Sequence, residues 1–131
     1  MQSMNKALFL DRDGTINVDK HYLINPDEFV FEKNVAEVLK LAQQKGYLLI
    51  VLTNQSGIAR GYFGEQELHK LHTHIQGEAA KNGFLFSDFF YCPHYKNGSV
   101  KEYSVECDCR KPKPGLINQA LQKYNSIFLN R

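Results

Sequence analysis

The feature that most constrains this chain is a continuous apolar run, Tyr47–Leu52, which recurs in shorter form at Ala7–Leu10 and Phe89–Tyr91. Unbroken apolar runs, without polar alternation, are typical of strands that are buried on both faces of a parallel sheet. Parallel neighbours need long crossover connections, which are usually helical. The three runs therefore predict an α/β domain with helices on both faces of the sheet.

The segments between and after these runs have the spacing of amphipathic helices. The positions expected to face the core in three successive helices are Val35, Val38, Leu39 and Ala42, then Leu68, Leu71, Ile75 and Ala79, then Leu116, Ile117, Ala120, Leu121 and Tyr124. Gly46 follows the first helix where glycine suits a C-cap. Ser126–Leu129 predicts the beginning of a fourth strand. We therefore expect one α/β domain over residues 1–131, a parallel sheet with right-handed crossovers that stops after the start of that strand.

Length and charge exclude several classes of protein. A chain of 131 residues can form one domain with its own core, and a formal net charge of +2 is too small to favour nucleic acid or a membrane surface. The longest apolar run is far shorter than the ~20 residues of a membrane-spanning helix. No apolar core of a secretory signal follows Met1–Lys6. We therefore expect a cytoplasmic protein with no nucleic-acid or membrane partner.

Two carboxylates, Asp11 and Asp13, follow the first apolar run, and Gly14 and Thr15 then turn the chain. Residues i and i+2 of an extended strand face the same side, so both side chains can converge at the carboxyl end of the strand. Open α/β sheets bind their ligands along that edge. Taken alone, the pair is explained equally well by an acidic turn that caps the strand. Adjacent carboxylates repel, however, unless a cation or a reaction requires them.

The two carboxylates suit phosphoryl transfer. Asp11 can attack phosphorus and form an aspartyl phosphate. Asp13 is placed to protonate the leaving alkoxide and later to deprotonate the attacking water. Mg²⁺, which prefers oxygen ligands, would balance both charges and bridge to the phosphate.

Polar groups at the other strand ends can complete such a site, because the carboxyl ends of parallel strands lie on one edge. Thr53 offers a hydroxyl, and Asn54 a backbone N–H, to the phosphoryl group. Lys111 supplies a point charge, and Arg110 a planar fork for a second phosphate or for sugar oxygens. The structural alternatives are a Thr53 that simply ends a strand and a solvated basic pair at Arg110 and Lys111.

All three cysteines lie close together, in the order Cys92-Pro-His94, twelve residues, Cys107-Asp-Cys109. An odd, clustered set does not fit a disulfide framework. Three thiolates and one imidazole fill a tetrahedral Zn²⁺ shell with no open position, which is typical of structural zinc. We therefore expect a zinc loop over residues 92–109 that also directs the two cations after it. Buried free thiols beside a surface histidine are the alternative.

The polar stretch at residues 17–32 is expected to form a loop over the carboxylates, where loops commonly carry function. The residues in it that are expected to contact substrate are Asp19, Lys20, His21 and Tyr22. His69, His72 and His74 lie on the second predicted helix. We expect exposed helical histidines there rather than a second metal site.

Several motifs together resemble the haloacid dehalogenase superfamily of phosphatases. Asp11-Arg-Asp13-Gly-Thr15 resembles its first motif, Thr53 its second and Lys111 its third. Three longer stretches closely resemble the D-glycero-D-manno-heptose 1,7-bisphosphate phosphatases, whose relatives include histidinol-phosphate phosphatases. These stretches are Thr53-Asn-Gln-Ser-Gly-Ile-Ala-Arg-Gly61, the Cys92–Cys109 loop and Arg110-Lys-Pro-Lys-Pro-Gly115.

The resemblance implies a Rossmann-like fold, a zinc-bound loop and Mg²⁺-dependent hydrolysis. The implied partner is a small sugar bisphosphate that loses its 7-phosphate on the route to nucleotide-heptoses for surface polysaccharide, and the implied state is a monomer. By this resemblance Asp11 is the nucleophile and a Mg²⁺ ligand, and Asp13 is the acid/base with its backbone oxygen on the metal. Thr53 and Lys111 would steady the phosphoryl group, and Arg110 would recognise substrate. The implied lining of the sugar phosphate is Asp19, Lys20, His21, Tyr22, Thr53, Asn54, Gln55 and Ser56.

One motif of the family has no counterpart here. The fourth motif, a Gly-Asp with further acidic residues, supplies another Mg²⁺ ligand, whereas here Ile127–Leu129 is followed by Asn130 and Arg131. Either the form is truncated or Asn130 replaces part of the motif poorly, and in both cases we expect weak or absent phosphatase activity with zinc still bound. Two alternatives stay open: a histidinol-phosphate phosphatase, and a non-catalytic, zinc-stabilised module that binds sugar phosphates.

Overall fold

Three parallel strands form one sheet in the order β1-β2-β3. The computed structural model describes residues 6–124. Its elements are β1 Lys6–Leu10, η1 Pro26–Glu28, α1 Val35–Gln44, β2 Tyr47–Asn54, α2 Glu65–Lys81, β3 Asp88–Cys92, η2 Lys101–Tyr103 and α3 Gly115–Lys123, where η denotes a short 3-10 helix. The predicted parallel α/β sheet is confirmed, while the predicted strand Ser126–Leu129 lies outside the described residues.

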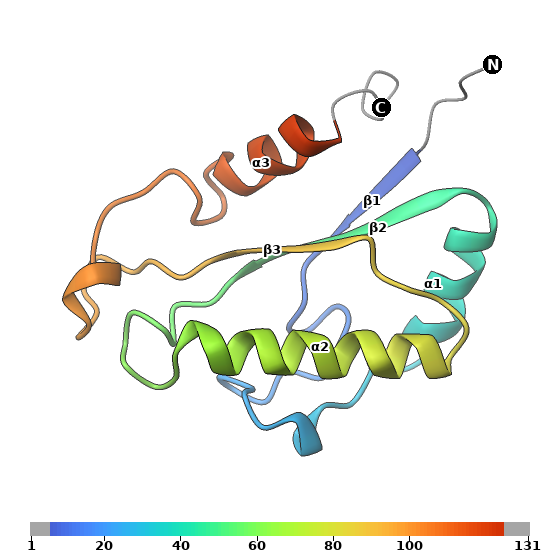
Figure 1. Cartoon of the computed structure of the whole chain (residues 1–131), viewed down its shortest axis with the longest axis horizontal. Helices are drawn as coiled ribbons and strands as arrows, with labels where there is room; N and C mark the ends of the chain where they lie inside the picture. The colour runs from blue at the N-terminus through green and yellow to red at the C-terminus, as the bar shows by residue number, and fades with distance from the viewer. Residues whose placement is uncertain (1–5, 125–131) are drawn as a thin grey trace.

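Helices cover both faces of the sheet, with α2 and α3 on opposite sides (Figure 1). Leu49 and Val51 of β2 pack in one cluster with residues of α1 and α2, and Ile50 and Leu52 pack in another with Leu116 of α3. None of these four β2 residues is more than 6% exposed. The continuous apolar run of β2 therefore reflects a strand that meets a helix on each face.

Two of the three helices, α1 and α3, bury narrower stripes than their sequence spacing predicted, whereas α2 buries the predicted stripe. All four predicted positions of α2 are fully buried, namely Leu68, Leu71, Ile75 and Ala79. On α1, Leu39 is buried but Val38 is 57% exposed, because residue 38 lies beside the contact stripe. Ile117 is 39% exposed for the same reason, since α3 packs through Leu116 and Ala120, one turn apart. Both predictions of burial were wrong.

The end of α1 agrees with a simpler expectation. Gly46 adopts a φ of +94° directly after the C-cap of α1, a left-handed conformation that glycine enters without strain. The predicted stop at this residue is confirmed. Within residues 6–124, none of the helices combines the length and the apolar character needed to cross a membrane.

The carboxyl ends of the three strands lie at one edge of the sheet, where the polar motifs begin. Leu10 of β1 lies opposite Val51 of β2, and Asn54 at the end of β2 lies opposite Cys92 at the end of β3. The backbone N–H of Gln55 then donates to the carbonyl of Cys92 at 2.8 Å. The segments that follow the three strands are therefore neighbours.

Candidate active site and metal cluster

The ammonium group of Lys111 lies beside the first carboxylate after β1. Its Nζ is 3.0 Å from Asp11 Oδ1 and donates to the Leu52 carbonyl at 2.8 Å. Asn54 clamps the backbone of Lys111, because its Oδ1 accepts the Lys111 N–H at 2.9 Å and its Nδ2 donates to the Lys111 carbonyl at 3.2 Å. The end of β2 thus holds Lys111, which precedes α3, beside Asp11, which follows β1.

Asp13 is held by a different set of groups. The fully buried Arg12 donates from Nη2 to both carboxylate oxygens of Asp13, at 2.8 and 3.0 Å, and from Nε at 3.3 Å. Asn17 Nδ2 and Gln55 Nε2 donate to the same carboxylate at 3.1 and 3.3 Å. Because three residues share this carboxylate, its orientation is fixed.

Strand alternation does not place these two carboxylates, contrary to the prediction. β1 ends at Leu10, so Asp11 and Asp13 both belong to the turn that follows. The side chain of Asp11 is 52% exposed and pairs with Lys111, whereas that of Asp13 is 27% exposed and pairs with Arg12. The two side chains therefore point toward different cations, Asp11 toward Lys111 and Asp13 toward Arg12.

A cavity of about 220 Å³ opens beside Asp13. It is lined by Asp13, Asp19, His21, Tyr22, Asn54, Gln55 and Ser56. Thr53 is buried behind this lining, where its Oγ1 accepts a hydrogen bond from Gln55 Nε2 at 2.9 Å. The structure therefore brings the predicted loop and strand-end residues together around one cavity. Neither Lys20, which is exposed, nor Asp11 lines the cavity.

The loop over this cavity holds two residues in a strained backbone conformation. His21 and Tyr22 have φ values of +56° and +66°, in the left-handed region that side chains other than glycine disfavour. The His21 N–H donates to Asp19 Oδ1 at 2.9 Å, and the Tyr22 ring packs edge-on against Tyr62, with 4.8 Å between ring centres. Strain of this kind gathers at ligand sites. It therefore supports a binding role for the loop.

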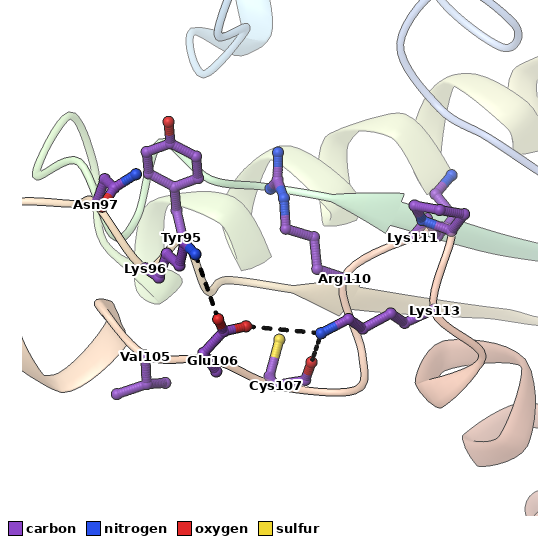
Figure 2. A pocket seen from close by; sticks show the side chains of 10 residues that line it. Tyr95, Lys96, Asn97, Val105, Glu106, Cys107, Arg110, Lys111 and Lys113 are labelled. Carbon is purple, nitrogen blue, oxygen red and sulfur yellow. Dashed lines mark hydrogen bonds and ion pairs between the residues drawn. The ribbon is translucent and has the colours of Figure 1, made fainter.

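A larger cavity, of about 320 Å³, lies between the two ends of the cysteine-rich loop, residues 92–109, and the segment 110–113 that follows it (Figure 2). Figure 2 shows Arg110 and Tyr95 pointing to the same side. The guanidinium of Arg110 is 5.2 Å from the centre of the Tyr95 ring, and that of Arg60 is 4.1 Å from the same centre. Within residues 6–124, neither arginine pairs with a carboxylate, and the buried Nη1 of Arg110 has no hydrogen-bond partner. This cationic pair suits an anion.

Arg60 is a site residue that sequence reasoning missed. It lies in the Thr53–Gly61 motif, six residues after the end of β2, and its Nε is 3.5 Å from Ser56 Oγ. The only signal was a single arginine in a motif whose other residues are all uncharged. Its approach to Tyr95 depends on how the cysteine-rich loop folds back, which a local pattern does not contain.

His72 is buried, contrary to the expectation of exposed helical histidines. Its side chain is 6% exposed, its Nε2 lies 3.1 Å from Arg12 Nη1, and its ring stacks on Phe89. Burial and then the charge of Arg12 lower the pKa of His72 to about 3. The signal that could have revealed it is its place four residues after the buried Leu68. His69 is exposed, as expected.

Four potential ligand atoms gather at the predicted zinc loop. Those of Cys92, His94, Cys107 and Cys109 all lie within 4.8 Å of one another. Cys107 Sγ is 3.5 Å from each of the other two sulfurs, and His94 Nδ1 is 3.3 Å from Cys109 Sγ and 3.7 Å from Cys92 Sγ. Zinc–sulfur bonds of about 2.3 Å in a tetrahedron imply sulfur–sulfur separations of about 3.8 Å, close to those of these four pairs, and three thiols with one imidazole are a donor set that fits zinc.

The sulfur atoms of Cys92 and Cys109 also lie in disulfide contact, which the odd cysteine count did not predict, while Cys107 is a free thiol. Such a bond would account for two of the four gathered groups and would leave Cys107 and His94 without a role. In the part of the chain that the structure describes, no second group of three or more potential metal ligands occurs at the helical histidines or elsewhere.

A carboxylate at the start of α2 ties that helix to the cysteine-rich loop. Glu65 accepts hydrogen bonds from the hydroxyl groups of Tyr91 and Tyr103, the second at 2.7 Å. These two bonds lower the pKa of Glu65, and the bond to Glu65 raises the pKa of Tyr103. α2, β3 and η2 therefore meet at one carboxylate.

Known proteins share both the sequence motifs and this fold. The model of the polynucleotide kinase 3 phosphatase family matches residues 6–130. The D-glycero-beta-D-manno-heptose-1,7-bisphosphate 7-phosphatase of Haemophilus ducreyi is 48% identical over 121 residues, which are 92% of this chain and 66% of that protein. The enzyme of the same name from Vibrio cholerae is 46% identical over 124 residues, 95% of this chain and 67% of that protein. The chain thus spans about two thirds of the length of the curated relatives it matches.

Two solved structures show the same arrangement of elements. The D,D-heptose 1,7-bisphosphate phosphatase from B. bronchiseptica, complexed with magnesium and phosphate, aligns with a TM-score of 0.80 at 30% identity, covering 92% of this chain and 64% of that one. A Mesorhizobium loti protein described as a HAD-like phosphatase aligns with a TM-score of 0.85 at 34% identity, covering 94% of this chain and 59% of that one. The chain therefore belongs to the polynucleotide kinase 3 phosphatase family, within the haloacid dehalogenase-like phosphatases.

Proposed function

We propose that this chain removes the 7-phosphate of D-glycero-D-manno-heptose 1,7-bisphosphate in nucleotide-heptose biosynthesis. The observation that carries the proposal is the half-exposed carboxylate of Asp11, 3.0 Å from Lys111 Nζ, next to an Asp13 held by Arg12. A nucleophile, a balancing cation and an oriented acid/base are the groups that this hydrolysis needs. Several relatives at 42–48% identity carry the name of this reaction, which supports the choice of substrate.

Asp11 is the proposed nucleophile. Its carboxylate oxygen forms a bond to phosphorus, the bond from phosphorus to the sugar oxygen breaks, and an aspartyl phosphate results. Lys111, already beside this carboxylate, balances charge on the phosphoryl oxygens. Thr53 is proposed to steady the same group through its hydroxyl, at a position fixed by Gln55.

Asp13 is the proposed acid and base. It first gives a proton to the departing sugar alkoxide and then takes one from the water that attacks phosphorus. That second step breaks the aspartyl bond and restores Asp11. The hydrogen bonds from Arg12, Asn17 and Gln55 fix the direction in which this carboxylate can exchange a proton.

Mg²⁺ is the proposed cofactor. The fit rests on donor chemistry, because Asp11 and Asp13 supply the hard oxygen ligands that the ion prefers and Asp11 is half exposed. When bound, the ion would neutralise charge on the phosphate. The B. bronchiseptica relative was solved with magnesium and phosphate, which supports the same choice.

The second phosphate of the substrate is proposed to bind at Arg110. Its buried Nη1 has no partner among the described residues, so a bound phosphate would satisfy a donor that is otherwise unpaired. Arg60 lies across the same tyrosine ring and adds positive charge. The sugar between the phosphates would meet Asp19, His21 and Tyr22 in the smaller cavity.

Zinc is the proposed occupant of the cysteine cluster, with Cys92, His94, Cys107 and Cys109 as its ligands. Metal analysis and thiol titration separate this from a disulfide. We expect one zinc per chain in the native protein. After the protein is denatured without reductant and a chelator removes the zinc, we expect three reactive thiols. A protein with no zinc and a single reactive thiol would contradict the proposal.

Phosphate release tests the proposed function directly. We expect Mg²⁺-dependent release from the heptose bisphosphate, even if the rate is low, and its loss in Asp11→Asn. Faster release from histidinol phosphate would assign the chain to that substrate instead. If no release occurred at any Mg²⁺ concentration although the sugar phosphate bound, the chain would be a binding module, and the proposed hydrolysis would be wrong.

A further inference from the structure

Arg12 is a buried cation that bridges two distant parts of the chain. Its side chain is 0% exposed. Nη2 and Nε point at the carboxylate of Asp13, at 2.8 to 3.3 Å, and Nη1 lies 3.1 Å from His72 Nε2, sixty residues away. Within residues 6–124, His72 is the only acceptor for Nη1. A buried donor that loses its acceptor costs about 1–3 kcal/mol, and more when it is charged.

The chemistry of this pair fixes the state of the imidazole. A guanidinium only donates, so Nε2 of His72 must carry a lone pair and the ring proton must be on Nδ1. Burial and the charge of Arg12 lower the pKa of His72 to about 3, which keeps the ring neutral near neutral pH. The ring stacks on Phe89, with 4.5 Å between centres and 20° between planes. The other titratable groups facing it are His69 on α2 and Tyr91 on β3.

We propose that His72 is a positioning residue for Asp13, because it accepts from Arg12 and so holds the guanidinium fork on that carboxylate. The inference rests on the proposed function, in which Asp13 protonates the leaving group. Without an acceptor at position 72, the guanidinium would turn toward other acceptors and leave Asp13 with only the hydrogen bonds from Asn17 and Gln55. Asp11 and Lys111 contact neither His72 nor the Arg12 side chain, so substrate binding should be spared.

Three variants test this role. His72→Leu removes the acceptor, and His72→Gln restores one through its amide oxygen. His74→Leu is the matched control, because His74 lies on the same helix, is partly exposed and does not contact Arg12. With folding checked by thermal unfolding, we expect His72→Leu to lower kcat about tenfold or more while KM stays within about threefold. His72→Gln should stay within about threefold of the wild type.

Leaving-group dependence separates positioning from a general loss of structure. The ratio kcat/KM reports the steps up to the aspartyl phosphate, in which an alkoxide needs a proton and a nitrophenolate does not. In His72→Leu we expect kcat/KM to fall about tenfold for an alkyl phosphate and less than about threefold for p-nitrophenyl phosphate. An equal fall for both substrates would overturn the positioning role.

Two further outcomes keep this inference distinct from the proposed function. An active wild type whose His72→Leu variant retains kcat/KM for the alkyl phosphate contradicts the positioning role alone. A wild type that releases no phosphate from any substrate contradicts the proposed function, and the positioning role with it. Nitrogen-15 NMR tests the contact without turnover: we expect a neutral His72 with its proton on Nδ1, and a protonated ring or the other tautomer at about pH 7 would overturn the inference.

Discussion

The buried imidazole of His72 makes the free energy of unfolding depend on pH in the acid range. The pKa of His72 is about 3 in the folded chain, because of burial and the charge of Arg12, against 6.5 for a free histidine. Between these values the unfolded chain binds a proton that the folded chain does not. Stability is therefore lost as pH falls from about 6.5 toward about 3, and this residue has no such effect above that range.

We expect the wild type to lose up to about 1.4 kcal/mol of unfolding free energy per pH unit below about pH 6.5, relative to His72→Gln. Gln has the acceptor but does not titrate, so the difference between the two proteins isolates the imidazole. Urea unfolding of both, at about pH 7 and about pH 5, measures it. The same difference at both pH values would contradict the prediction.

The exposed pair of Asp11 and Lys111 should matter for chemistry and little for stability. Surface ion pairs contribute about 0–1 kcal/mol, and the two side chains are 52% and 29% exposed. We expect Asp11→Asn to abolish turnover while the unfolding free energy changes by less than about 1 kcal/mol. Phosphate release and urea unfolding, with the exposed Asp27→Asn as control, check both parts. Residual turnover near that of the wild type would exclude Asp11 as the nucleophile.

At the scale of the element, the sequence pattern predicted correctly those strands and helices whose burial depends on a regular spacing of apolar residues. The apolar run of β2 and the stripe of α2 could be read from spacing alone, because each follows from one repeating geometry. The burial of His72 could not, since its partner Arg12 is sixty residues away and the contact depends on how α2 turns against the loop after β1. Asp11 and Lys111 could be expected near one another only because parallel strands end at a common edge.

The start of α2 should be coupled to the cysteine-rich loop through Glu65. Tyr103→Phe removes one of the two hydroxyl donors to this carboxylate and keeps the ring. We expect a loss of about 1 kcal/mol in unfolding free energy, measured by urea unfolding. Tyr62→Phe, which changes an exposed ring, is the control. If both variants unfolded like the wild type, Glu65 would not link these elements energetically.

At the scale of the whole molecule, the cysteine-rich loop is joined to several other parts. The carbonyl of Ala59 accepts the N–H groups of Ser99 and Val100, each at 2.8 Å, and Glu65 binds Tyr103. The loop then continues directly into Arg110. A metal ion bound by the cysteines at the base of this loop would therefore affect both the packing of α2 and the position of Arg110, the proposed phosphate-binding residue.

We expect removal of the proposed zinc by a chelator to lower the Tm, to open the loop to proteolysis within residues 95–106 and to raise KM for the bisphosphate, since Arg110 loses its support. Calorimetry, limited proteolysis and kinetics, each repeated after zinc is restored, measure these effects. An unchanged Tm and KM after verified loss of the metal would show that the cluster needs none.

The last residues of β2 and the one that follows hold two groups of the site: the Leu52 carbonyl and the Asn54 side chain both bind Lys111, and Gln55 joins Thr53 to Asp13. Removing one residue before them would turn every later side chain to the opposite face and break all these links together. Over generations of mutation, the apolar half of this strand should accept changes in volume, whereas its length should stay constant. Insertions and deletions are then expected to survive only in loops outside residues 47–55.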